Sequence, residues 1–150
     1  MADDTVKFEL VSPERMLASV EADSVTVPGM EGDLTAMPNH APFLTTLRPG
    51  HVVVRGQDEA RYFVSGGFAE IYDNTVTVLA EVGMEHQELT RAWLEERIEQ
   101  ARGAVEEAGP EQIQPATQKL NDYLGVLAHT DLPPGSDSSA PLKTSAPAPG

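Results

Sequence analysis

The chain has 150 residues, and its 24 Asp and Glu against 10 Lys and Arg give a formal net charge of −14. An acidic field of this size repels the phosphates of nucleic acid and of anionic lipid, which excludes nucleic acid as a partner. The chain contains no cysteine, and this excludes disulfides, thiolate metal sites and a cysteine nucleophile. No apolar run is long enough to span a bilayer, so any membrane contact is expected to come through a partner.

The first half of the chain has the alternation of β-strands. Between residue 5 and about residue 82, Val, Thr, Ile, Phe and Tyr recur with a period of two in short runs separated by Gly, Pro, Asp and Asn. The clearest unit runs from Phe68 to Val82, where Asp73 and Asn74 suit a two-residue type I′ turn. The spacing predicts roughly eight to ten short antiparallel strands in a β-sandwich or flattened barrel.

The period changes to that of a helix from Glu88 to about Ala128. A first helix is expected to end at Gly109-Pro110. A second is expected to start at Pro110 or, because Pro115 interrupts its stripe, after Pro115. Each helix has a single apolar stripe, so the two are expected to pack against each other or against the strands. The stripes consist of Leu94, Ile98, Ala101, Val105 and Ala108, and of Ile113, Leu120, Tyr123, Leu124 and Leu127.

These patterns divide the chain into three parts. They predict an all-β domain over residues 1–86 and an antiparallel two-helix hairpin over 87–129. Residues 130–150 are rich in Pro, Ser, Ala and Gly with little to bury, and they predict a disordered tail without an assigned function.

No catalytic or metal-binding motif stands out along the chain. The pair Gly66-Gly67 predicts a bulge or bend in a strand rather than a phosphate-binding loop. The histidines lie in separate segments without a metal-ligand spacing, so neither a metal site nor a cofactor is predicted; they are His40, His51, His86 and His129. A free-standing enzyme on a sandwich scaffold therefore has no residue cluster in its favour.

Glu31 and Asp33 differ from the other carboxylates because they lie in the Gly-bounded turn PGMEGD. Loops of this kind on a rigid scaffold are frequent binding positions. A simple hairpin turn with polar tips explains the same residues equally well. Local chemistry alone leaves both interpretations open.

Two long motifs together carry a family resemblance. The segments VTVPGMEGDLTAMPNHAPFLTTLRPG at 25–50 and YFVSGGFAEIYDNTVTVLAE at 62–81 resemble, in order and spacing, the epsilon subunit of the bacterial F-type ATP synthase. The resemblance covers residues 5–85 strongly and the helical hairpin in architecture. It implies a ten-stranded β-sandwich followed by two antiparallel helices.

The resemblance also implies a function. It predicts a non-catalytic subunit of the central stalk that turns with the rotor, links the gamma subunit to the c ring, and couples proton flow to ATP synthesis. Its place is the cytoplasmic face of the bacterial inner membrane, reached only through the complex. By the same resemblance, the residues that face the c ring are Glu31, Gly32, Asp33 and His40.

The helical hairpin leaves two roles open. The resemblance implies helices that extend toward the alpha and beta subunits and inhibit ATP hydrolysis, but the second predicted helix offers only Lys119 as a cation. The alternative is an ATP-sensing, self-inhibitory switch. Glu88, Arg91 and Ala92 would be its nucleotide contacts, although the predicted second helix has no arginine and Gln87-Glu88 replaces the first two motif positions.

Overall fold

The computed structural model describes residues 4–134. The chain divides after His86 into two compact units, the first built of strands and the second of helices. No helix within the described range is both long and apolar enough to cross a membrane.

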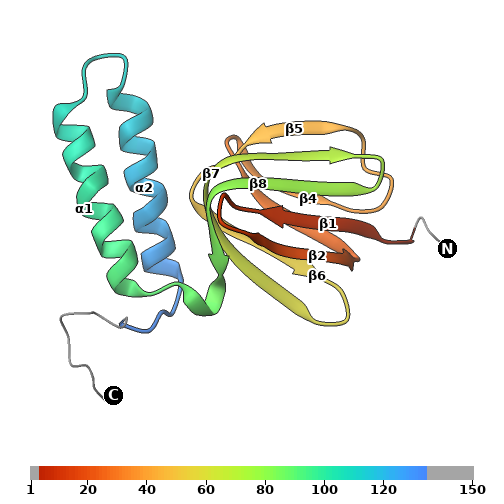
Figure 1. Cartoon of the computed structure of the whole chain (residues 1–150). Coiled ribbons are helices and arrows are strands. Elements are labelled where there is room, and N and C mark those ends of the chain that lie inside the picture. The colour runs from red at the N-terminus through yellow and green to blue at the C-terminus, as the bar shows by residue number, and fades with distance from the viewer. Residues whose placement is uncertain (1–3, 135–150) are drawn as a thin grey trace. The chain divides into compact units, whose positions relative to one another are not determined.

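The first unit is an eight-stranded sheet that folds over on itself (Figure 1). The strand order is β2-β1-β8-β7-β6-β3-β4, and β5 pairs with β7. The strands are β1 (Val6–Val11), β2 (Met16–Ala22), β3 (Ser24–Gly29), β4 (Gly32–Ala36), β5 (Phe43–Thr46), β6 (Gly50–Arg55), β7 (Glu59–Tyr72) and β8 (Thr75–Glu85).

The two long strands β7 and β8 join the layers of the sandwich. The first part of β7 pairs with β6, and its last part pairs with β5. Between these parts, Gly66 and Gly67 have φ values of 78° and 96°, and a Cβ on Gly67 would collide with the carbonyl oxygen of Leu79. The pairing with β8 keeps one register on both sides, so the glycines make the bend that was predicted and not a bulge.

The β-sandwich prediction is confirmed, with eight strands in place of about ten. Sequence patterns overcount here because a strand that bends at glycines resembles two short strands. The prediction of a purely antiparallel sheet is wrong in one place, since β1 and β8 run parallel. The turn prediction at Asp73-Asn74 is confirmed, because both residues have positive φ, 51° and 61°, as a type I′ turn requires.

Between the layers lies a core formed by alternate residues of the strands. Phe8, Leu10, Val25, Val52 and Val76 are each 0% exposed and belong to one cluster. Their neighbours along each strand point outward, as a period of two requires. This rigid core fixes where the turns and edges of the sandwich stand.

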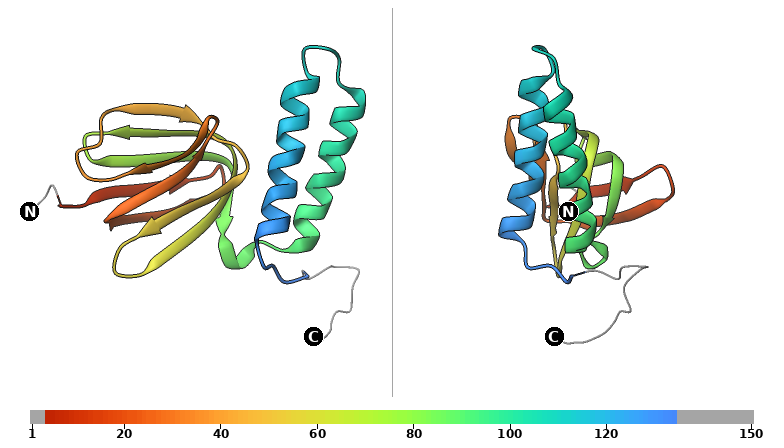
Figure 2. Two further views of the ribbon diagram at one scale, coloured as in Figure 1. Left: turned by 180° about the vertical axis from the view of Figure 1, so that it is seen from behind. Right: turned by 90° about the vertical axis from the view of Figure 1, so that its left-hand side faces the viewer.

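The second unit is an antiparallel pair of helices, α1 (Arg91–Glu107) and α2 (Ile113–His129), which follow the 3₁₀ turn η2 (His86–Glu88) (Figure 2). The Thr90 hydroxyl accepts a hydrogen bond from the Trp93 N–H at 3.1 Å and caps α1. α2 starts at Ile113, between the two expected starting points. Pro115 lies in its first turn, where the N–H groups have no intrahelical partners and proline is tolerated.

The five residues after α2 fold back onto α1. Leu132 is only 6% exposed. The carbonyl oxygens of Pro133 and Pro134 accept hydrogen bonds from the backbone N–H groups of Arg91 and Ala92, at 2.9 and 3.1 Å. The disordered tail predicted from residue 130 therefore does not include 130–134, and its remainder, 135–150, lies outside the described residues.

Candidate docking surfaces

The strand β4 forms one edge of the sheet, and three of the predicted docking residues lie at its start. Glu31, Gly32 and Asp33 are exposed in and next to the tight β3–β4 turn, in which Gly29 pairs with Gly32. Gly32 has φ of 132°, a conformation that residues with a Cβ rarely adopt. The sequence thus forms a short turn that presents Met30 and Glu31 to solvent at its tip.

Arg48 anchors this turn from outside the hairpin. Its Nε donates to the Gly29 carbonyl at 3.0 Å, and its Nη2 pairs with the Asp33 carboxylate at 2.7 Å. The Met30 N–H donates to the Thr46 carbonyl at 3.0 Å. The turn is therefore held at both ends by the segment 46–48.

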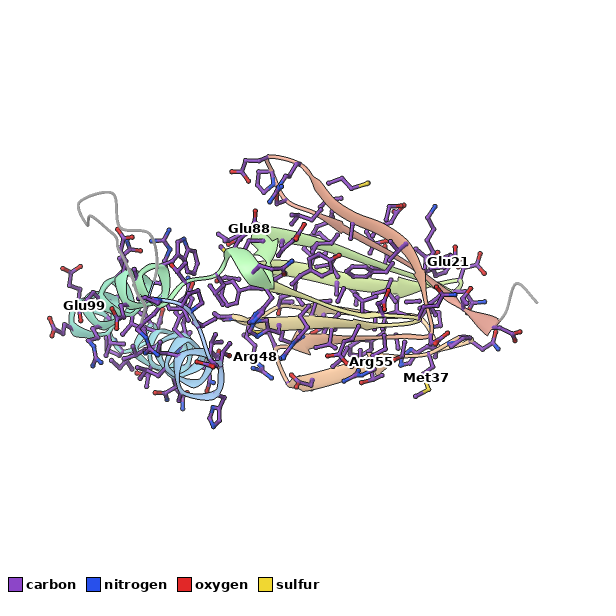
Figure 3. All side chains as sticks on the ribbon, turned by 90° about the horizontal axis from the view of Figure 1, so that it is seen from below. Glu21, Met37, Arg48, Arg55, Glu88 and Glu99 are labelled. Atoms are coloured by element: carbon purple, nitrogen blue, oxygen red, sulfur yellow. The ribbon has the colours of Figure 1, made fainter. Side chains whose placement is uncertain are left out.

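His40 lies beyond the other end of β4. Strand β4 advances by roughly 13 Å along its five residues, which separates His40 from the turn at Glu31. The loop around His40 is fixed by Asn39, whose N–H donates to Asn74 Oδ1 at 2.6 Å. Figure 3 shows the same separation, with Arg48 at one end of the sandwich and Met37 at the other. The four predicted residues thus do not form a cluster but flank one sheet edge.

An exposed apolar row crosses the outer face of the other layer, and sequence reasoning missed it. Val11 pairs with Met16 and with Leu79, and Leu79 pairs with Phe68, so these four side chains form the apolar row. Met16, Leu79 and Phe68 are 56%, 40% and 43% exposed, and Leu44 on the neighbouring strand β5 is 64% exposed. Contiguous apolar residues on a surface indicate a protein–protein contact. The available signal was that β1, β7 and β8 carry apolar residues in both phases of their alternation.

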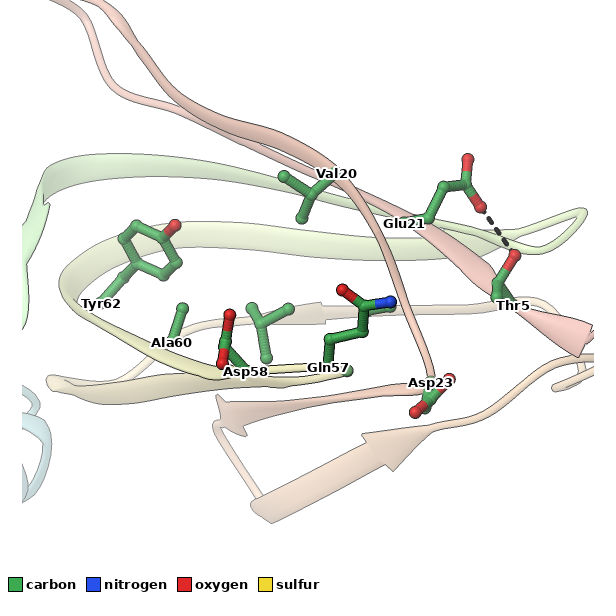
Figure 4. A pocket seen from close by; sticks show the side chains of 11 residues that line it. Thr5, Val20, Glu21, Asp23, Gln57, Asp58, Ala60 and Tyr62 are labelled. Atoms are coloured by element: carbon green, nitrogen blue, oxygen red, sulfur yellow. Dashed lines mark hydrogen bonds between the residues drawn. The ribbon is translucent and has the colours of Figure 1, made fainter.

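A groove of about 490 Å³ opens between β2 and the β6–β7 hairpin (Figure 4). Val20, Ala60 and Tyr62 supply apolar surface, and burial with the Glu85 carboxylate raises the pKa of Tyr62 above 10.0. The carboxylates of Glu21, Asp23 and Asp58 also line the groove, and Glu21 accepts a hydrogen bond from the Thr5 hydroxyl at 2.7 Å. The lining residues include no Lys or Arg, so the groove does not suit a phosphate-bearing ligand.

A family model described as "ATP synthase, Delta/Epsilon chain, beta-sandwich domain" matches residues 5–86. The chain belongs to the ATP synthase epsilon-chain family. The epsilon chain of Rhodobacter capsulatus is 48% identical over 130 residues, which cover 86% of this chain and 98% of that one. The epsilon chain of Rhizobium meliloti is 47% identical over 127 residues, covering 83% and 91%. The chain is accordingly a non-catalytic subunit of an ATP synthase, a membrane-associated complex.

Solved structures agree on the fold. A chain in the mitochondrial ATP synthase of Euglena gracilis, solved as an assembly of OSCP, F1 and c ring, superposes with a TM-score of 0.66 at 19% identity. The match covers 83% of this chain and 81% of that one. A chain of the Tetrahymena thermophila central stalk and c ring gives a TM-score of 0.56 at 15% identity, covering 81% and 96%.

The residues considered as nucleotide contacts, Glu88, Arg91 and Ala92, lie at and just before the start of α1, where the surroundings do not favour a phosphate group. A helix N-terminus binds anions through its backbone N–H groups, but those of Arg91 and Ala92 are bonded to carbonyl oxygens of the chain itself. Glu88 lies in η2 and adds negative charge close by in sequence. The Arg97 guanidinium stacks on Trp93, 4.4 Å from the ring centroid, and is engaged there.

The structure brings together two histidines that the sequence keeps far apart. His51 Nε2 and His86 Nδ1 lie 3.1 Å apart, and the His51 ring meets Phe63 edge-on. Burial, with the nearby Arg61 and His86 charges, lowers the pKa of His51 to about 4. The His51 imidazole is therefore neutral near pH 7. Across residues 4–134, no group of three or more His, Cys, Asp or Glu gathers to hold a metal ion.

Proposed function

We propose that the chain works in the central stalk of the ATP synthase, where its sandwich links the gamma subunit to the c ring and couples proton flow to ATP synthesis. The observation that carries this proposal is a pair of separate exposed surfaces on one rigid sandwich, the β4 edge and the apolar row. A rotating link needs two contacts that hold a constant geometry while torque passes between them. Membership of the epsilon-chain family supplies the complex in which such a link works.

The β4 edge is the surface proposed for the c ring, with Glu31, Gly32, Asp33 and His40 as its docking residues. A braced turn loses little conformational entropy when a partner binds, which favours a contact of modest size. Two solved structures with a similar fold come from ATP synthase assemblies that include a c ring, and this supports the choice of partner. Docking there would place the chain on the cytoplasmic face of the bacterial inner membrane.

The apolar row of Met16, Val11, Leu79 and Phe68 is the surface proposed for gamma. An apolar patch exposed on a sheet layer is stabilised when a partner removes it from water, by about 25 cal/mol per Å² of buried apolar area. The row is continuous across four strands, so a partner can cover it as one surface.

The hairpin is not required for these contacts. An inhibitory reach toward alpha and beta would depend on basic side chains along α2, and within Ile113–His129 the only Lys or Arg is Lys119. The ATP-sensing alternative is not favoured, because the α1 N-terminus is bonded to Pro133 and Pro134. The proposal therefore rests on the sandwich.

The test is binding of the full chain to purified gamma subunit, measured by calorimetry. We expect Phe68→Glu to weaken binding at least tenfold, because it places a charge within the apolar row. Val20→Glu is the matched control, since Val20 is 44% exposed and lies in the groove, outside the row. Equal affinity for wild type and Phe68→Glu, with unchanged circular dichroism, would reject the assignment of the row to gamma.

A further inference from the structure

We propose that Arg48 is a positioning residue that holds the β3–β4 turn in its docking conformation, and that Asp33 serves this brace rather than the partner. Met30 and Glu31 are then the residues of the turn that make contact. This inference rests on the proposed docking of the β4 edge and refines it, since Arg48 lies outside the docking residues that the family resemblance indicates.

The geometry of Arg48 suits a brace. One guanidinium reaches both sides of the turn, bonding the Gly29 carbonyl on β3 at 3.0 Å and the Asp33 carboxylate on β4 at 2.7 Å. The Arg48 backbone N–H donates to the Pro28 carbonyl at 3.0 Å, so its own main chain is attached to the same hairpin. A planar guanidinium can make both side-chain bonds at once, whereas a lysine ammonium presents a single point charge.

The residues around Arg48 fix its backbone. Pro49 has a restricted φ, and a Cβ added to Gly50 would lie 2.9 Å from Pro28 Cβ, which shows how closely this segment approaches β3. The Met30 N–H bond to the Thr46 carbonyl adds a second attachment on the other side of the turn. The brace therefore comes from a segment that is hydrogen-bonded to β3 and packed closely against it.

The solvent exposure of the Arg48–Asp33 ion pair indicates that the pair positions the turn and contributes little to the stability of the fold. The Asp33 side chain is 67% exposed and that of Arg48 is 27% exposed. An ion pair with this much solvent contact adds little to global stability, so its loss should leave the fold intact. The charge of Asp33 is already paired with that of Arg48, while Glu31 at the tip makes no ion pair within residues 4–134. The free charge of the turn is thus that of Glu31.

The experiment compares Arg48→Gln, Arg48→Lys, Asp33→Asn and Glu31→Gln in the full chain. Hydrogen exchange of the Met30 to Gly32 amides in the purified chain reports the brace directly. We expect Arg48→Gln to accelerate exchange at least tenfold and Asp33→Asn to do so less, with Arg48→Lys restoring only part of the protection. Glu31→Gln should leave exchange unchanged, because its side chain is not part of the brace.

The second readout is ATP-driven proton pumping by the assembled complex in vesicles, with the same variants. We expect Arg48→Gln and Glu31→Gln both to reduce pumping per ATP hydrolysed, the first by loosening the turn and the second by removing a contact. Unchanged exchange in Arg48→Gln would overturn the inference. Faster exchange with full pumping in both variants would leave the brace standing and overturn the docking of this edge. Loss of pumping in Asp33→Asn with normal exchange would return Asp33 to the contact residues.

Discussion

The sandwich and the hairpin reach their folded states by different means. In the sandwich, strands far apart in sequence pair directly, as β1 does with β8 and β5 with β7. In the hairpin, two neighbouring helices pack along stripes of period 3.6, closed by the short segment 130–134. A sheet with such close backbone approaches has positions that accept glycine only. A helix surface has few such positions, so replacing glycine by alanine should lower stability in the sandwich and raise it in the hairpin.

The pair of glycines Gly67 and Gly103 tests this contrast with one chemical change. Gly67→Ala forces a Cβ into the Leu79 carbonyl at φ of 96°, and we expect it to destabilise the sandwich by at least about 3 kcal/mol. Gly103 lies inside α1 with nothing within 4 Å of an added Cβ, so Gly103→Ala should stabilise the hairpin by about 0.5–1 kcal/mol. Urea unfolding followed by circular dichroism measures both.

A single result would break the comparison. If Gly67→Ala unfolds at the same urea concentration as wild type, the bend in β7 does not depend on glycine. The close approach to β8 would then relax without cost, and the sandwich would be no more demanding than the helices.

The same contrast explains what the sequence could predict. The period of two in the strands, the Asp73-Asn74 turn and the apolar stripe of α1 are local patterns that the structure confirms, with Leu94, Ile98 and Ala101 buried. The α2 stripe is confirmed only in part, because Tyr123 is buried but Ile113 is 40% exposed, and the buried Val126 was not predicted. The parallel pairing of β1 with β8 could not be inferred, because no turn links the two strands and their partnership depends on the closure of the whole sandwich.

Site residues follow the same rule. The turn with Glu31 and Asp33 was visible from its glycines, but the reach of Arg48 across 15 positions to Asp33 was not. The apolar row escaped notice because it assembles one residue from each of four strands. Pro133 and Pro134 looked like part of a tail, since backbone carbonyls carry no sequence signal for capping another helix.

The segment 130–134 gives the next largest effect and is confined to the hairpin. Leu132→Ala removes a side chain that is 6% exposed, and we expect about 2–3 kcal/mol of destabilisation together with faster exchange of the Arg91 and Ala92 amides. Ile113→Ala is the control, because Ile113 is 40% exposed. Sandwich amides should keep their wild-type protection. Equal protection of Arg91 in Leu132→Ala and in wild type would show that this segment does not hold the helix end.

The smallest effect concerns pH and belongs to the sandwich. The pKa of His51 is about 4 in the folded state and 6.5 in the unfolded chain. Between pH 4 and pH 6.5 the unfolded chain therefore binds a proton at His51 that the folded chain does not bind. Stability should therefore fall as pH decreases from 6.5 to 4, by about 1–2 kcal/mol once the partial exposure of the ring is allowed for. The groups that face His51 include Arg61 and His86, and both oppose its protonation.

Unfolding of wild type and of His51→Gln, measured across this pH range, isolates the contribution of His51 to stability, and His129→Gln on the exposed end of α2 is the control. Parallel pH curves for wild type and His51→Gln would mean that His51 takes up its proton in the folded sandwich as readily as in the unfolded chain.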